Sequence, residues 1–188
     1  GLYSTASAGS AWAGYLFVHE FGHHFAGLAD EYYTSPVAYE PQRFTVEPWE
    51  PNVTALADPA ALKWARFATA SSPVPTPWPK AEYEETMRAF QAERAELRRA
   101  GRPEAEMNAL FTEVQSFVDK LFAEAPQRAA IGAFEGAYYA ASGYYRPAMN
   151  CLMFTRHEAF CSVCAAAVEE TIDLYVAAPG HSDNATRE

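Results

Sequence analysis

Prolines constrain the fold of this chain more than any other feature of its sequence. Nine of the 13 prolines lie between Pro36 and Pro79. A proline lacks the amide hydrogen that helices and inner strands need, and its ring fixes one backbone angle. The stretch is therefore predicted to be extended loop and turn. Its apolar residues favour a loop packed onto a body over a free linker; they are Phe44, Trp49, Leu56, Leu62, Trp64 and Phe67.

Helical periodicity appears on both sides of this loop. Residues 11–26 (AWAGYLFVHEFGHHFA) are predicted to form a buried helix, with Ser10 as its N-cap and Gly27 at its end. Residues 81–123 carry two apolar stripes interrupted by AGRP, which predicts an antiparallel helical hairpin inserted into the domain. Such stripes are normally core, so we interpret the hairpin as a packed structural insertion; a partner-binding arm is the alternative.

The remaining chain divides into two parts. Residues 131–147 (IGAFEGAYYAASGYYRP) are glycine-spaced and rich in tyrosine, and they are interpreted as irregular, substrate-facing chain. Residues 158–176 return to helical spacing. The predicted fold is mainly α, in a chain whose length fits one domain.

Composition excludes several classes of function. The 188 residues are 49% hydrophobic and 14% aromatic, which is enough for a packed core. Acidic residues outnumber basic ones by 24 to 14, and the net charge of −10 disfavours nucleic acid and anionic membranes as partners. No apolar run approaches the roughly 20 residues that span a bilayer, so no transmembrane segment is expected.

The strongest chemical motif is His19-Glu20-Phe21-Gly22-His23, which has the H-E-x-x-H pattern. Residues four apart lie on the same face of a helix, so His19 and His23 can direct two imidazoles at one zinc ion. Glu20 then lies beside the open coordination position, where it can act as a general base. His24 points about 100° away from His23 and is interpreted as a supporting or packing residue.

A third protein ligand is expected after this helix, because catalytic zinc sites combine three protein ligands with one open position. Asp30 is seven residues beyond His23, about 10 Å further along a straight helix. It can reach the same ion only if the chain turns back, and Gly27 stands where that turn is needed. We predict Asp30 as the third ligand and Glu31 as the second choice.

A metal-free interpretation also exists, in which His19 and His23 are core histidines that hydrogen-bond to Asp30 or Glu31. A helix this apolar would rarely bury two imidazoles and a carboxylate without charge compensation. The motif therefore favours the metal site.

Several segments resemble a known family. HEFGHHFAGLADEYY (19–33) is similar to the zinc motif of the IgA-peptidase-type metallopeptidases, bacterial zinc endopeptidases related to the metzincins. FEGAYYAASGYYRPAMNCLM (134–153) resembles that family's Glu-Gly…Tyr-Arg-Pro…Cys-x-Met stretch, and FCSVC (160–164) resembles its ending. EPNVT and LKWARF are similar to its middle. The resemblance covers most of the chain outside the predicted hairpin.

The resemblance implies a role for individual residues. It implies His19, His23 and Asp30 as zinc ligands and Glu20 as the general base. Met153 would be the methionine turn, an apolar floor beneath the metal, and the helix at 158–176 would be the C-terminal helix that follows it.

The chain departs from the metzincin pattern in two respects. That pattern has Gly seven and His ten residues after the first His, where this chain has Ala26 and Ala29; Gly27 and Asp30 each come one place later. Metzincin-like folds also build a twisted sheet before the zinc helix, and its edge strand holds the substrate. No such segment precedes the motif here. We therefore expect residues 1–188 to be the C-terminal part of a larger α+β zincin catalytic domain, completed by an upstream part of the same polypeptide.

Other residues have alternative interpretations. Tyr145 and Arg146 are candidate substrate-binding residues, and with Tyr32, Tyr33 and Tyr144 they could stabilise a developing oxyanion. The alternative is aromatic packing with an exposed Arg.

The three cysteines leave three possibilities open. Cys151, Cys161 and Cys164 could form a structural zinc site with His157. A disulfide from Cys151 to either partner fits an exported protein, and three free thiols fit a cytosolic one.

The sequence as a whole predicts a zinc-dependent endopeptidase that is secreted or periplasmic in a bacterium and acts on a protein or peptide substrate. The alternative is a non-catalytic, zinc-organised binding module that engages a protein or glycoprotein partner. The intact His19, Glu20 and His23 favour the enzyme, because a binding module has no need of Glu20. A zinc hydrolase of small amides is a further, weaker alternative.

Overall fold

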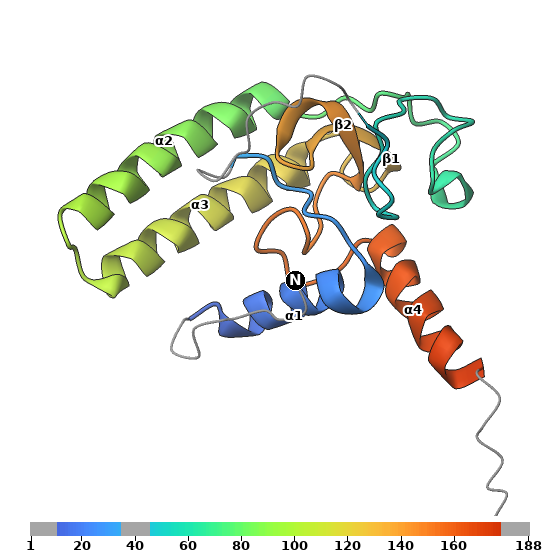
Figure 1. Ribbon diagram of the computed structural model, residues 1–188. Coiled ribbons are helices and arrows are strands. Elements are labelled where there is room, and N and C mark those ends of the chain that lie inside the picture. Colours follow the sequence, from blue (N-terminus) through green and yellow to red (C-terminus); the bar gives the residue numbers. More distant parts are fainter. Residues whose placement is uncertain (1–10, 35–45, 178–188) are drawn as a thin grey trace, which may run out of the picture.

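The computed structural model describes residues 11–34 and 46–177 (Figure 1). Within these ranges the chain is mixed α+β and mostly helical, with four α-helices, one short 3-10 helix and one two-stranded antiparallel sheet. The elements in order are α1 (Ala13–Ala26), the 3-10 helix Ala65–Phe67, α2 (Lys80–Arg99), α3 (Glu104–Glu124), β1 (Ile131–Ala137), β2 (Ala140–Ala148) and α4 (Ser162–Ala177). None of the described helices combines the length and the apolar character needed to cross a membrane.

Helix α1 carries the H-E-x-x-H motif and ends as the sequence predicted. It begins at Ala13 with Trp12 in the N-cap position, slightly later than expected, and Ser10 lies outside the described residues. Gly27 ends the helix in the left-handed conformation, with φ 62°. A Cβ at this position would come 2.8 Å from the ring of Trp49, so both backbone angle and space require glycine.

The prediction that this helix is buried was wrong. In α1 the buried residues are His19 and Gly22, which face the body of the protein. A Cβ added at Gly22 would be 3.1 Å from the Sδ of buried Met153, so glycine lets the helix lie directly on this methionine. The opposite face is exposed through Phe17, Val18 and Phe21. An apolar sequence does not reveal which of its faces the rest of the described chain covers.

The hairpin predicted over residues 81–123 corresponds to α2 and α3, which run side by side in Figure 1 and are joined by residues 100–103. Its inner residues belong to the main core cluster: Tyr83, Met87, Phe90, Leu110, Val118 and Phe122. The hairpin is therefore packed onto the body. That it is an insertion remains a prediction.

Residues 131–147, predicted to be irregular, instead form the hairpin of β1 and β2. Phe134 pairs with Arg146, and Ala137 pairs with Ala140 across a two-residue turn. Both turn residues, Tyr138 and Tyr139, have positive φ (54° and 63°), as a type I′ turn requires. The sequence carries no hairpin signal here, because such turns usually contain Asn-Gly or Asp-Gly, and the strands are interrupted by glycines.

The proline-rich loop packs onto the body, as predicted, and it does so along both edges of this small sheet. On the β2 side, Thr54 exchanges two backbone hydrogen bonds with Tyr145 (3.1 and 2.8 Å). On the β1 side, the Thr76 amide donates to the Ala133 carbonyl (2.8 Å), and the Trp64 indole donates to the Gly132 carbonyl (2.7 Å). Leu62 and Trp64 are buried and Phe67 is half-buried, whereas Trp49 and Leu56 are exposed; Phe44 lies outside the described residues.

Helix α4 confirms the predicted C-terminal helix but not the whole of its apolar stripe. Val163, Cys164 and Ala167 near its start are buried, whereas Ile172 and Tyr175 are exposed. The helix packs at its start and then extends away from the body (Figure 1), so its distal apolar residues have little chain to cover them.

Candidate metal centre

Three of the residues predicted as metal ligands converge in the structure. The ligand atoms of His19, His23 and Asp30 lie within 4.8 Å of one another. The two histidine Nε2 atoms are 3.1 Å apart. Asp30 Oδ1 lies 3.0 Å from the Nε2 of His19 and 3.2 Å from that of His23. This compact triangle has nearly the edge length, about 3.3 Å, of three ligands around one tetrahedral zinc ion with bonds of about 2.0 Å.

Hydrogen bonds on the far side of each imidazole set its protonation. His19 Nδ1 donates to the Leu152 carbonyl (3.2 Å), and His23 Nδ1 donates to the Leu28 carbonyl (2.6 Å). A carbonyl can only accept, so in each neutral imidazole the proton is on Nδ1 and the lone pair is on Nε2. Two lone pairs and a carboxylate oxygen therefore point at one another. Such a group requires a cation at its centre, either a metal or an added proton.

The chain after α1 carries Asp30 back to the histidines. Gly27 reverses the direction of the chain. The side chain of buried Asn52 then forms two hydrogen bonds with the backbone of Ala29: the Ala29 amide donates to Asn52 Oδ1 (2.8 Å), and Asn52 Nδ2 donates to the Ala29 carbonyl (3.0 Å). The Glu31 amide donates to the Met153 carbonyl (2.9 Å). The sequence offered no sign of the role of Asn52 beyond the similarity of EPNVT to the family.

Tyr139 is a site residue that sequence reasoning missed. Its hydroxyl donates to Asp30 Oδ2, which leaves Oδ1 for the two histidines. The amides of Tyr138 and Tyr139 donate to the carbonyls of Asp30 and Tyr32 (both 3.1 Å), so the tip of the β-hairpin is attached to the chain that carries the candidate ligand. Two non-glycine residues with positive φ cost of order 1–2 kcal/mol each, and here that cost falls at the candidate site.

The electrostatics of the triangle keep Asp30 ionised. Burial alone would raise the pKa of Asp30, but the imidazoles of His19 and His23, which share an added proton with its Oδ1 when no metal is bound, and the Tyr139 hydroxyl outweigh burial and hold the pKa well below its usual range. Burial also raises the pKa of Tyr139 well above its usual value, and the neighbouring Asp30 carboxylate raises it further. Tyr139 therefore stays protonated and remains a donor.

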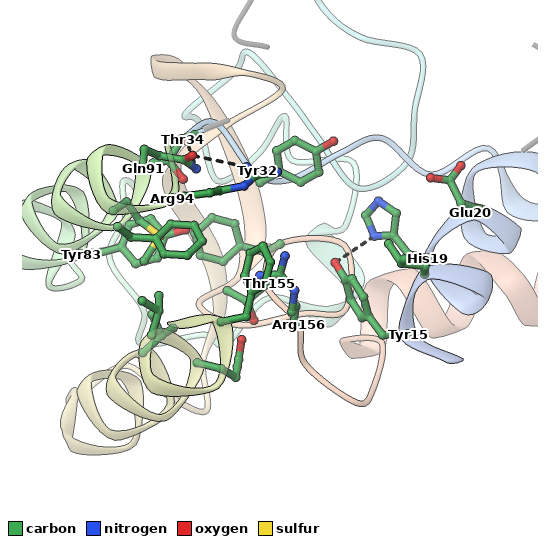
Figure 2. A pocket seen from close by; sticks show the side chains of 18 residues that line it. Tyr15, His19, Glu20, Tyr32, Thr34, Tyr83, Gln91, Arg94, Thr155 and Arg156 are labelled. Atoms are coloured by element: carbon green, nitrogen blue, oxygen red, sulfur yellow. Dashed lines mark hydrogen bonds between the residues drawn. The ribbon is translucent and has the colours of Figure 1, made fainter. Parts of the chain in front are cut away.

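A cavity of about 260 Å³ opens beside these residues (Figure 2). Glu20 and His19 of α1 line it on one side, and residues of α2 and α3 line the other. Two cations also line it, Arg94 of α2 and Arg156 of the chain that follows Met153. Neither forms an ion pair with a described residue; the Arg156 guanidinium instead lies 3.9 Å from the centre of the Phe111 ring. The helical hairpin thus lines the candidate site as well as packing on the core.

The structure separates the remaining candidates from this triangle. Glu31, the second choice as third ligand, is fully buried and turns the other way, towards Asn52 and Cys164. Arg146 was predicted as a substrate-binding residue or as an exposed Arg, and both interpretations need correction. Its side chain is fully buried, donates to the Gly136 carbonyl (2.6 Å) and stacks 3.7 Å over the Phe154 ring, because β2 turns it into the core.

Of the four tyrosines considered for substrate or oxyanion binding, the structure places one at the cavity and three away from it. Tyr33 and Tyr144 are buried, and Tyr145 is half-buried in a separate cluster with Trp64 and Val163. Tyr32 lines the cavity and stacks on His19, with 6.1 Å between ring centres. A role in substrate binding remains a prediction for Tyr145, and Tyr32 is the better-placed oxyanion candidate of the two.

A family model for the IgA peptidase M64 family matches residues 1–172 of the chain. The chain belongs to this family. M64 membership makes it a peptidase of a metallopeptidase family, with a protein or peptide as substrate, and it confirms the resemblance found in the zinc-motif and Cys-x-Met segments. No curated protein matches the chain.

Proposed function

We propose that this M64 peptidase is a zinc-dependent endopeptidase whose ligands are His19, His23 and Asp30 and whose general base is Glu20. The observation that carries the proposal is the convergence of two imidazole lone pairs and one carboxylate oxygen at 3.0–3.2 Å, on the helix that also carries Glu20. Two nitrogens and one oxygen are the protein donor set of a catalytic zinc site, and His19 and Glu20 both line the neighbouring cavity. When bound, zinc lowers the pKa of water and polarises a peptide carbonyl.

The residues of the chain would supply the rest of the reaction. Glu20 accepts the proton of the attacking water and passes it to the amine that leaves when the peptide bond breaks. Tyr32, which lines the cavity and stacks on His19, would donate a hydrogen bond to the oxyanion that develops on the scissile carbonyl. Met153 would form the apolar floor of the site, since its Sδ lies against Gly22, between His19 and His23 on α1.

The cavity next to Glu20 would receive a side chain of the substrate. Arg94 and Arg156 line it without ion-pair partners among the described residues, in a protein whose net charge is −10. We therefore propose that this cavity prefers an acidic substrate side chain, whose carboxylate would pair with these guanidinium groups.

The test combines metal content with hydrolysis of casein by the full polypeptide. Glu20→Gln should keep its metal and lose about 10²- to 10⁴-fold in rate, because the ligands remain and the base is gone. His19→Ala should lose both metal and activity. Glu85→Gln, an exposed change of the same chemistry on α2, is the matched control and should leave both unchanged.

Two results would contradict the proposal. The first is folded wild-type protein that binds no metal at His19 and His23. The second is full hydrolysis by Glu20→Gln. Metal binding that is retained without hydrolysis by the wild type would instead favour the zinc-organised binding module. Secretion or a periplasmic location is proposed only from the resemblance.

A further inference from the structure

A second group of possible metal ligands lies apart from the triangle of His19, His23 and Asp30. Among the described residues, the ligand atoms of Cys151, Cys161, Cys164 and Glu31 all lie within 4.8 Å of one another. Cys151 and Cys164 have no exposed surface, Cys161 is half-buried, and Glu31 is fully buried. The three cysteines are free thiols. The protein therefore gathers three sulfur atoms and a carboxylate in a dry part of its core.

The distances within this group match the edges of a metal-centred tetrahedron. Zinc–sulfur bonds of about 2.3 Å and zinc–oxygen bonds of about 2.0 Å place two sulfurs about 3.8 Å apart and a sulfur and an oxygen about 3.5 Å apart. Cys151 Sγ and Cys164 Sγ are 3.7 Å apart, and Cys164 Sγ lies 3.3 Å from Glu31 Oε1.

An unpartnered polar atom at the same place points independently to a ligand. Glu31 Oε1 accepts a hydrogen bond from Asn52 Nδ2 (3.0 Å), but its Oε2 is buried and has no hydrogen-bond partner. A buried carboxylate oxygen without a donor costs several kcal/mol unless a cation compensates it. Arg146, also fully buried, interacts electrostatically with Glu31 and Cys151 but forms no ion pair with a described residue.

The local backbone suits thiolate ligands. Cys161 and Cys164 have the Cys-x-x-Cys spacing common in structural zinc sites and lie at the start of α4, where the helix dipole favours negative charge. The Cys161 amide donates to Cys151 Sγ (3.3 Å), a bond that stabilises a thiolate. His157, the fourth ligand considered from the sequence, is not part of this group; Glu31 takes its place.

We infer that Cys151, Cys161, Cys164 and Glu31 form a second, structural metal site for a thiophilic divalent ion, Zn²⁺. Its four ligands close the coordination sphere, so the site stabilises the fold and performs no catalysis. It joins three parts of the chain. Glu31 adjoins Asp30, Cys151 lies two residues before Met153, and the other two cysteines fix the start of α4. The site therefore connects the segment that carries Asp30, the candidate catalytic ligand, with the segment that carries Met153.

The experiment counts metals in the full chain and identifies their ligands by cobalt exchange. Wild-type protein should bind two zinc ions per chain. The double variants His19→Ala/His23→Ala and Cys161→Ser/Cys164→Ser should each bind one. After exchange with Co²⁺, thiolate-to-cobalt charge-transfer absorption should appear in the wild type and in the histidine variant. His157→Ala is the matched control and should keep both ions.

Two measurements on the wild type test for thiolate ligands even if Cys161→Ser/Cys164→Ser does not fold. Denatured protein in chelator, without reductant, should show three reactive thiols. One reactive thiol would mean a disulfide, and a cobalt-loaded wild type without charge-transfer absorption would mean no sulfur ligand; either result overturns the inference. The outcome is independent of the proposed function, since an inactive protein with thiolate-bound cobalt keeps this site and rejects only the peptidase mechanism.

Discussion

Replacing Tyr139 by Phe tests whether the tip of the β-hairpin strengthens metal binding at the candidate site of His19, His23 and Asp30. The change removes the hydroxyl that donates to Asp30 Oδ2 and keeps the ring that packs edge-on against Tyr32. A hydrogen bond to a charged group contributes about 1.5–3 kcal/mol. At about 1.4 kcal/mol for each factor of ten, its loss should weaken zinc binding at the histidine site about 10- to 100-fold, the range typical of residues that orient a metal ligand.

The assay is a competition titration of zinc between the protein and a chromophoric chelator at neutral pH. The affinity of the cysteine cluster serves as an internal reference, since Tyr139 is not one of its candidate ligands. Tyr138→Phe is the matched control. It lies in the same turn with the same positive φ, but its hydroxyl bonds Glu50 (3.4 Å), so its zinc affinity should not change.

The reasoning is refuted if Tyr139→Phe binds zinc within twofold of the wild type. Equal weakening by both variants would also refute it, because the effect would then come from the turn rather than from the bond to Asp30.

Three further changes test other parts of the structure. Gly27→Ala should lower the free energy of unfolding by at least about 1–2 kcal/mol in urea titrations, because alanine is strained at φ 62° and its Cβ would meet Trp49. Burial tends to raise the pKa of Glu47, but hydrogen bonds from Lys63 and the Ala55 amide lower it overall. The ionised Glu47 carboxylate therefore stabilises the fold above the ordinary carboxyl pKa of about 4.3, and this stabilisation disappears as the pH falls through the lower pKa of Glu47 in the folded protein. Glu47→Gln should lower the free energy of unfolding by at most about 1 kcal/mol at pH 7, because solvent screens the interaction, and should not change it below the folded pKa of Glu47. An equal loss at the two pH values would contradict this. Arg94→Gln should reduce kcat/KM about tenfold for peptides with an acidic side chain at the cavity and leave neutral peptides unchanged, as measured with a peptide library.

The sequence was most informative where a single element determines the outcome. His19 and His23 share a helical face because they are four residues apart, and Gly27 ends that helix because it alone adopts left-handed φ without strain. The clustering of prolines correctly predicted a packed loop, and the two stripes correctly predicted a helical hairpin over 81–123, which the structure forms as helices at 80–99 and 104–124. These properties follow from local backbone geometry and periodicity.

Contacts between distant segments were the part that the sequence left open. Asp30 and Glu31 are adjacent and chemically alike, yet the fold turns Asp30 to the histidines and Glu31 to the cysteines. Tyr139 reaches Asp30 across 109 residues of chain, from a turn whose sequence has no turn signal. Arg146 is buried because its strand faces the core, which its charge would not suggest. Periodicity fixes which side chains share a face, but only packing decides what that face meets, and both candidate metal sites depend on that choice.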